Sequence, residues 1–117
     1  MPSHANCLFC RIANGEIPAK IVHEDADVVA FHDINPQAPT HILVIPRRHI
    51  AMLNDMTEAD VAAIGTTVLR ATEIARQLRL DSEGYRLVVN NGEAAGQTVF
   101  HIHMHLIGGR AFGWPPG

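Results

Sequence analysis

Residues 101–107 alternate histidine with apolar side chains, and this alternation constrains the fold more than any other part of the chain. A period of two is typical of a β-strand, in which side chains at i, i+2 and i+4 share one face. The pattern predicts a strand with His101, His103 and His105 on one face, neighbouring side chains lying about 6.6 Å apart at ~3.3 Å rise per residue. The opposite face is apolar and consists of Ile102, Met104 and Leu106.

Three imidazoles in a row indicate a reaction centre, because histidine transfers protons near neutral pH, attacks phosphorus and binds metals. Directly before them lies a glycine-bearing loop, residues 90–97, whose backbone N–H groups can bind a phosphate. Gln97 and Thr98 add polar side chains beside it. This combination suits phosphoryl or nucleotidyl transfer through a covalent phosphohistidine. The loop lacks the Lys and Ser/Thr of a Walker A motif, so a P-loop nucleotide site is not indicated.

The composition is that of one soluble globular domain over residues 1–117, with 47% hydrophobic and 18% charged residues. A net charge of -3 argues against a general nucleic-acid coat and against a protein that binds anionic membranes. No apolar run reaches the ~18 residues that span a bilayer, and the N-terminus has no signal-peptide pattern. We therefore expect a cytoplasmic protein without nucleic-acid or membrane partners.

The rest of the chain predicts an α+β fold, with an antiparallel sheet of about five strands, one long helix and one short N-terminal helix. Asn6 can cap the short helix over 7–13, which Gly15 ends. The long helix begins near Thr57, whose spacing to Asp60 resembles a capping box. Its core-facing stripe consists of Ile64, Val68, Ala71, Ala75 and Leu78. Further strands are expected over 20–24, 28–33, 41–45 and 85–89, and residues 108–117 form an irregular tail.

Both cysteines lie in one Cys-x-x-Cys motif, Cys7 to Cys10. In a reducing compartment such a motif favours a metal site or a redox function over a structural disulfide. A thioredoxin-type redox motif follows a strand, and no strand precedes Cys7, so the redox interpretation is the weaker one.

These features resemble the histidine triad (HIT) superfamily, whose signature is His-φ-His-φ-His-φ-φ with φ an apolar residue. The chain looks most like its branch of histidine triad nucleotide-binding proteins. Four further segments, residues 16–20, 30–34, 36–41 and 114–117, fit that branch in the same order, so the resemblance covers nearly the whole chain. It implies a HIT-like fold, with residues 1–117 forming a single HIT domain.

The resemblance also implies a reaction. His103 would attack the α-phosphorus of a purine nucleoside phosphoramidate or acyl-nucleotide, and water would hydrolyse the nucleotidyl-His103 intermediate to a nucleoside monophosphate such as AMP. His105 resembles the phosphate-binding histidine of the family, and His41 a histidine that supports the proton state of the nucleophile. The positions that hold phosphate oxygens and address the leaving group are Asn90, Gly96, Gln97 and Thr98.

The nucleotide pocket implied by the resemblance is largely apolar. Asp33 would accept hydrogen bonds from the ribose hydroxyls, and His32 belongs to the same pocket. The purine slot would consist of Leu8, Phe9, Ile12, Phe31, Ile34 and Leu43; without the family match, plain core packing explains these side chains better. In a homodimer the C-terminal tail would reach the partner's site, where Trp114 could touch the leaving group or merely cover an apolar patch.

Family members with this Cys-x-x-Cys motif resemble zinc-binding proteins in which two histidines complete the site. The set here is Cys7, Cys10, His49 and His101, a closed tetrahedral arrangement that suits structural Zn²⁺. Related enzymes without the motif use these two histidines in a proton relay, and the sequence leaves that alternative open. No organic cofactor is expected. Besides the phosphoramidase, two other functions stay open: a nucleotide-binding regulatory module, or another HIT reaction such as dinucleoside-polyphosphate hydrolysis.

Overall fold

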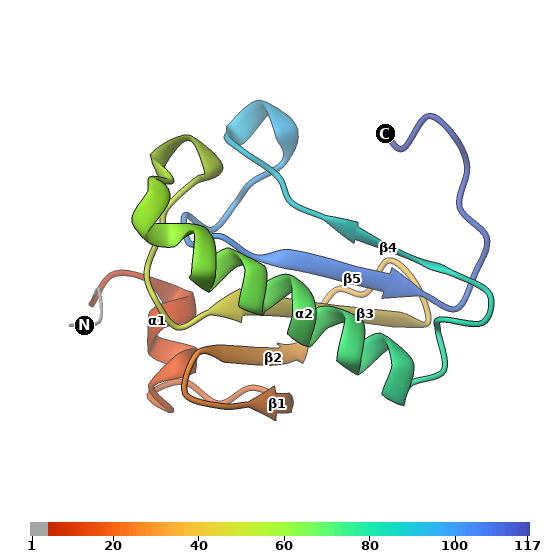
Figure 1. Cartoon of the computed structure of the whole chain (residues 1–117), viewed down its shortest axis with the longest axis horizontal. Helices are drawn as coiled ribbons and strands as arrows, with labels where there is room; N and C mark the ends of the chain where they lie inside the picture. The colour runs from red at the N-terminus through yellow and green to blue at the C-terminus, as the bar shows by residue number, and fades with distance from the viewer. Residues whose placement is uncertain (1–4) are drawn as a thin grey trace.

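The computed structural model describes residues 5–117 and confirms the predicted α+β architecture (Figure 1). Five strands form one antiparallel sheet in the order β1-β2-β3-β5-β4. They are β1 (Ile21–Glu24), β2 (Val28–His32), β3 (Thr40–Pro46), β4 (Tyr85–Val88) and β5 (Met104–Gly108). The helices are α1 (Leu8–Ala13) and α2 (Val61–Gln77), with 3-10 turns at Leu53–Asp55, Glu58–Asp60 and Glu93–Ala95. Over residues 5–117, no helix combines the length and apolar character needed to cross a membrane.

Helix α2 packs across one face of the sheet (Figure 1). The predicted stripe is partly wrong, because Val68 and Leu78 are 38% and 44% exposed. The buried side of the helix is rotated toward Thr67 and Ile74, which pack with Ala71 and Ala75. The sheet contributes Val28, Ala30, Ile42, Val44, Met104 and Leu106 to this core.

The predicted capping box is present, but it caps the 3-10 turn that precedes α2 and not the α-helix itself. The Thr57 N–H donates to Asp60 Oδ2 at 2.9 Å, and the box closes the 3-10 turn Glu58–Asp60. The α-helix itself begins one residue later, at Val61. Arg48 also donates from Nε to Asp60 Oδ1 at 2.7 Å, which ties the end of β3 to the start of α2.

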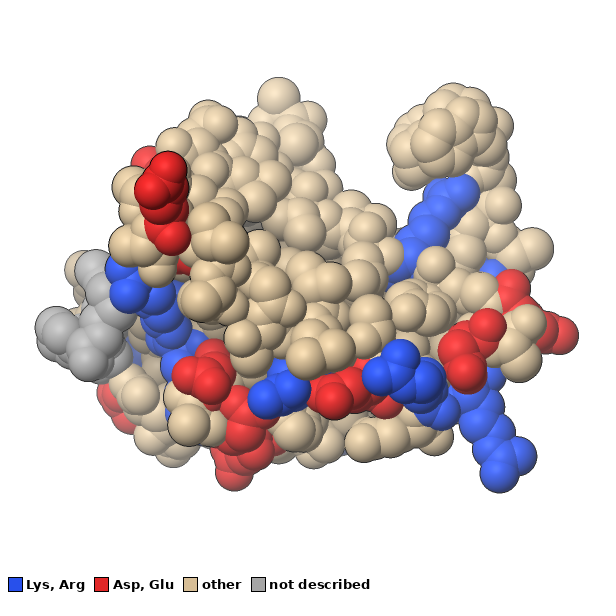
Figure 2. Space-filling view, viewed as in Figure 1, with Lys and Arg blue, Asp and Glu red and all other residues tan. Residues whose placement is uncertain are grey.

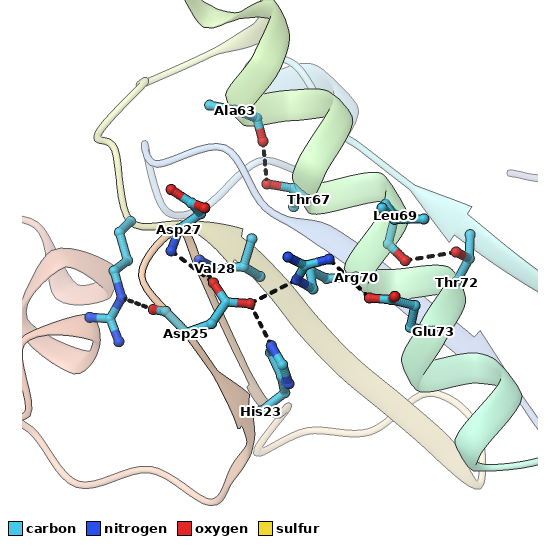
Figure 3. A network of polar contacts seen from close by, with 11 residues as sticks. His23, Asp25, Asp27, Val28, Ala63, Thr67, Leu69, Arg70, Thr72 and Glu73 are labelled. Atoms are coloured by element: carbon cyan, nitrogen blue, oxygen red, sulfur yellow. Dashed lines mark hydrogen bonds and ion pairs between the residues drawn. The ribbon is translucent and has the colours of Figure 1, made fainter.

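A polar network around Asp25 fastens α2 to the hairpin of β1 and β2 (Figure 3). The Nε of Arg70 donates to Asp25 Oδ2 at 2.8 Å, and His23 Nε2 lies 2.7 Å from the same oxygen. The backbone N–H groups of Asp27 and Val28 donate to Oδ1. Burial alone would raise the pKa of Asp25, but these hydrogen bonds together lower it well below its usual value. Acidic and basic side chains accordingly lie next to one another on this side of the molecule (Figure 2).

Helix α1 covers the opposite face of the sheet. Its buried side chains, Phe9, Cys10 and Ala13, pack there against strands β2 and β3. The strand residues in this cluster are Val29, Phe31, Leu43 and Ile45. Both faces of β3 are therefore covered, which explains its uninterrupted apolar run. The predicted N-cap at Asn6 is wrong: Cys7 is the N-cap, and its Sγ accepts a hydrogen bond from the Cys10 N–H. A sulfur atom thus takes the place of the expected amide oxygen.

The histidine strand is shorter than the alternation predicts. Strand β5 begins at Met104, so His105 lies in the sheet while His101 and His103 precede it. The pairing with β3 ends at Val44 and Met104, and further back the chain leaves that ladder. There the N–H of Ile102 donates to Ile50 O at 2.7 Å instead. Ile50 follows β3 in the chain, so this segment stays bonded to the continuation of β3 although it is no longer part of the sheet.

The C-terminal tail has no helix or strand after Gly108 and stands away from the body of the molecule (Figures 1 and 2). Arg86 of β4 holds its base by donating to Gly113 O and by lying over the Phe112 ring, 5.2 Å from its centroid. Arg110 lies over the same ring at 4.3 Å. Arg86 also lies 6.0 Å from the centroid of the Trp114 ring, although Trp114 is 84% exposed.

Candidate active site

His103 is buried, with 6% of its surface exposed. Its Nδ1 lies 2.8 Å from the carbonyl oxygen of His101. A carbonyl can only accept, so Nδ1 carries the proton and Nε2 holds a lone pair. Burial lowers the pKa of His103, while the bond to His101 and the negative charge of Asp33 oppose that shift. The ring is therefore neutral near pH 7, and its Nε2 can act as a nucleophile.

His105 lies beside it, with the two ring centroids 5.0 Å apart. Its Nδ1 is 2.8 Å from Nε2 of His41, which comes from the adjacent strand β3. Burial, and then the neighbouring His103 and His41, at which a second positive charge would be unfavourable, together lower the pKa of His105 to about 4, against the opposing effect of the Asp33 charge. His41 thus bonds directly to His105. The expected support of the nucleophile by His41 can only pass through that ring.

A pocket of about 940 Å³ opens on the α1 side of the sheet. It contains His41 and most of the predicted purine slot and ribose site, namely Leu8, Ile12, Phe31, His32, Asp33, Ile34 and Leu43. Phe9 does not line the pocket but packs against a residue that does. Its ring lies edge-on to Phe31 and to His103, with ring centroids 5.4 Å and 5.0 Å apart. Residues that the sequence reasoning did not place here are Ile17, Pro18, Ala19, Lys20, Pro36 and Pro39. They belong to loops without periodicity, so only the family match to residues 16–20 and 36–41 pointed toward them.

Asp33 stands at the polar end of the pocket. Its Oδ1 accepts the N–H of Asn35 at 2.7 Å. Its Oδ2 lies 3.4 Å from Nε2 of His41. The carboxylate therefore borders both the pocket and the histidine pair, and Oδ2 is the oxygen that can still turn toward a hydroxyl group.

The loop before the triad is shaped by Gln97, which is 1% exposed. Its amide nitrogen donates to the carbonyls of Ala51 and Val99, and its Oε1 accepts the N–H of Gly92. Both amide protons are used within the protein, so this side chain holds the loop. Gly96 has φ 96° and follows the turn Glu93–Ala95. Asn90 is half-buried and Thr98 exposed; these two side chains, like Gly96, lie outside the residues that line the pocket.

The four predicted metal ligands form a cluster next to His103. Their ligand atoms, from Cys7, Cys10, His49 and His101, all lie within 4.8 Å of one another. His101 Nδ1 is 3.4 and 3.5 Å from the two sulfur atoms, and His49 Nδ1 is 3.3 Å from Cys10 Sγ. Zinc bonds of ~2.3 Å to sulfur and ~2.0 Å to nitrogen place tetrahedral S and N ligands about 3.6 Å apart. The cluster could therefore hold a metal ion.

The tautomer of His101 also fits a metal ligand. Its Nε2 lies 2.7 Å from Pro46 O, so Nε2 carries the proton and Nδ1 directs its lone pair toward the sulfur atoms. The carbonyl of this same residue accepts the bond from His103. One residue therefore connects the cysteine and histidine cluster with the candidate nucleophile.

The fold and the site together define a single-sheet α+β protein in which two neutral histidines, the buried His103 and the half-buried His105, lie near a mainly apolar pocket. Comparison with known proteins identifies its family: the HIT domain profile matches residues 14–112, and the chain belongs to the HIT domain family. The resemblance inferred from the sequence is thereby confirmed.

Similar proteins span almost the whole chain. The purine nucleoside phosphoramidase of Escherichia coli strain K12 is 47% identical over 106 residues, 91% of this chain and 89% of that protein. The crystal structure of a HIT family hydrolase from Legionella pneumophila shares 53% identity and a TM-score of 0.94, covering 96% of this chain and all of that one. A histidine triad nucleotide-binding protein from Candida albicans shares 33% identity and a TM-score of 0.80, covering 96% of this chain and 85% of that one.

Proposed function

We propose that this chain is a purine nucleoside phosphoramidase that acts through a covalent nucleotidyl-His103 intermediate. The observation that carries the proposal is the neutral, buried His103, whose Nδ1 proton is bound to a backbone carbonyl and whose Nε2 keeps its lone pair. The relative in Escherichia coli that bears this activity in its name supports the choice of substrate class.

In the proposed reaction, Nε2 of His103 attacks the α-phosphorus of the phosphoramidate. The bond from phosphorus to the substrate nitrogen breaks, and the amine leaves with a proton taken from solvent. Water then attacks the same phosphorus and returns a proton to solvent, the bond to Nε2 breaks, and the nucleoside monophosphate is released. His105 holds a non-bridging phosphate oxygen, and its low pKa keeps it neutral near pH 7 before the substrate binds.

The remaining roles follow the family resemblance, and those of the purine and ribose residues are supported by their positions in the pocket. The purine lies between the apolar walls of the pocket, with Phe9 supporting them from behind, and His32 borders its rim. Asp33 accepts the ribose hydroxyls. The family resemblance assigns contacts with the phosphate and the leaving group to Asn90, Gly96 and Thr98, and Gln97 acts by holding their loop in shape.

Turnover of adenosine 5′-phosphoramidate tests the proposal. Wild-type protein should release AMP, and His103→Gln should lower kcat/KM by on the order of 10³-fold or more, because the nucleophile is lost. His23→Gln is the matched control, since His23 lies on β1 outside the pocket. Undiminished turnover by His103→Gln would overturn the proposal. AMP binding without turnover would favour a nucleotide-binding module, and preferred cleavage of dinucleoside polyphosphates another HIT reaction.

We also propose that Cys7, Cys10, His49 and His101 bind one structural Zn²⁺, which when bound would tie α1 to the sheet. Support comes from the spacing of the ligand atoms and from the proton on His101 Nε2. Protein purified without chelator should contain about one equivalent of zinc. Cys7→Ser and His49→Gln should contain less than about half, while His23→Gln retains the metal. Equal zinc content in all four proteins would contradict the assignment.

A homodimer completes the proposal, since Trp114 is exposed and does not line the pocket of its own chain. Exposed apolar side chains on α2, Val61, Val68 and Leu69, offer a surface for a second copy. Light scattering should give twice the mass of one chain, and a monomeric mass would refute this part. A cytoplasmic location likewise stays a prediction, tied to the need for two reduced thiols.

A further inference from the structure

The backbone N–H of Gln37 lies 3.0 Å from Nδ1 of His41. A peptide N–H can only donate, so His41 Nδ1 must present a lone pair. A neutral imidazole has a single N–H, and in His41 it is therefore on Nε2. A main-chain group outside the triad thus fixes the tautomer of a histidine in the site.

The same reasoning extends from His41 to His105. The protonated Nε2 of His41 donates to Nδ1 of His105 across 2.8 Å, so that nitrogen accepts and the proton of His105 is on Nε2. Asp33 Oδ2, at 3.4 Å, lies on the same side of His41 and also favours an N–H there. The direction of donation therefore runs from the Gln37 amide through two imidazoles.

We propose that the Gln37 backbone amide, acting through His41, sets the tautomer of His105, so that His105 offers an Nε2–H to a phosphoryl oxygen. This inference rests on the proposed function and deepens it. His103 has the opposite tautomer, because its Nδ1–H is bound to the carbonyl of His101. Neighbouring histidines of one motif thereby receive different chemistry: Nε2 of His103 is a nucleophile, and Nε2 of His105 is a donor.

The turn over residues 33–41 is built to hold this amide in place. The carbonyl of Gln37 accepts a hydrogen bond from Nε of Arg110 at 3.1 Å, and its side-chain amide donates to Asn35 O at 3.0 Å. At the base of the turn the N–H of Asp33 donates to His41 O at 3.0 Å. Residue 37 is thus anchored through its amide, its carbonyl and its side chain, which makes Gln37 a positioning residue.

The two tautomers are distinguished by ¹⁵N NMR of the ring nitrogens in ligand-free, histidine-labelled protein near pH 7.5. In His41 and His105 we expect Nδ1 to have the shift of an unprotonated nitrogen and Nε2 that of a protonated one. In His103 the pattern should be reversed. A protonated Nδ1 in His41 or His105 would overturn the inference. This readout needs no turnover, so it stands apart from any failure of the proposed reaction.

A pair of variants at residue 37 isolates the amide. Gln37→Pro removes the N–H, whereas Gln37→Ala keeps it. Gln37→Pro should give mixed tautomers of His41 and His105 and lower kcat about 10-fold with a smaller change in KM, because one transition-state hydrogen bond is weakened. Gln37→Ala should retain the wild-type ring shifts. Wild-type tautomers in a folded Gln37→Pro protein would refute the role of the amide, and if that variant does not fold, the wild-type spectrum decides alone.

Discussion

Acidification should destabilise this protein through His105. Burial is the main reason that the pKa of His105 falls from 6.5 to about 4 in the folded chain. Between these two values the unfolded chain binds more protons than the folded one, so stability rises with pH there. The stabilising effect is complete above about pH 6.5 and is lost as the pH falls toward 4.

The size of the effect follows from the two pKa values. A fall from 6.5 to about 4 corresponds to about 3 kcal/mol at full protonation of both states. His105 is only half-buried, so solvent screens part of the interaction. The expected loss is therefore about 2 kcal/mol near pH 4.

Urea unfolding at about pH 7.5 and about pH 4.5 measures this loss. Three proteins are compared: wild type, His105→Gln, and His32→Gln as a matched control whose side chain is exposed. Groups that do not interact with His105 contribute equally in all three proteins and cancel in the comparison. Wild type and His32→Gln should lose about 2 kcal/mol more on acidification than His105→Gln. An equal loss in all three would refute the depressed pKa of His105.

Three other substitutions test the loop before the triad, the residue after β5 and the C-terminal tail. Gln97→Ala should lower the free energy of unfolding by about 2–3 kcal/mol, because it leaves buried backbone groups unpaired; urea unfolding checks this. Gly109→Ala should destabilise by about 1–3 kcal/mol, since φ is 89° and a Cβ would lie 2.9 Å from Pro39 Cβ; a thermal midpoint within 1 °C of wild type would contradict it. Trp114→Ala should change stability by less than about 0.5 kcal/mol, because the side chain is 84% exposed, while raising KM for bulky leaving groups if the tail reaches a partner's site.

Local sequence patterns predicted the elements of this fold better than their edges. Residues 41–45 and 28–33 are strand-like from composition alone, and all of them except Asp33 lie in the sheet. The helix stripe failed at Val68 and Leu78 because periodicity gives the repeat of a buried face, while the sheet decides its rotation. The strand predicted to begin at His101 begins three residues later, at Met104, because its first residue depends on where the partner strand β3 stops pairing.

The sequence indicated which residues come together in the candidate site, but it did not predict the hydrogen bonds between them. The four metal-ligand candidates, far apart in the chain, were grouped correctly only through the family resemblance. His41 was expected to support the nucleophile, and the structure adds a direct bond from His41 to His105 that the sequence did not indicate. The Gln37 amide gives no signal in the sequence, because every residue except proline carries the same group. Tautomers depend on such tertiary contacts.

The nucleophilic role of His103 is tested most directly by rapid quenching of the protein with adenosine 5′-phosphoramidate, followed by mass spectrometry of its peptides. We expect one adenylyl group on the peptide that contains residues 101–107, fragmentation that places it on His103, and decay of the adduct as AMP appears. His105→Gln, which keeps the nucleophile, should still form the adduct, more slowly. An adduct on another residue, or AMP release that requires neither an adduct nor His103, would contradict the proposed chemistry.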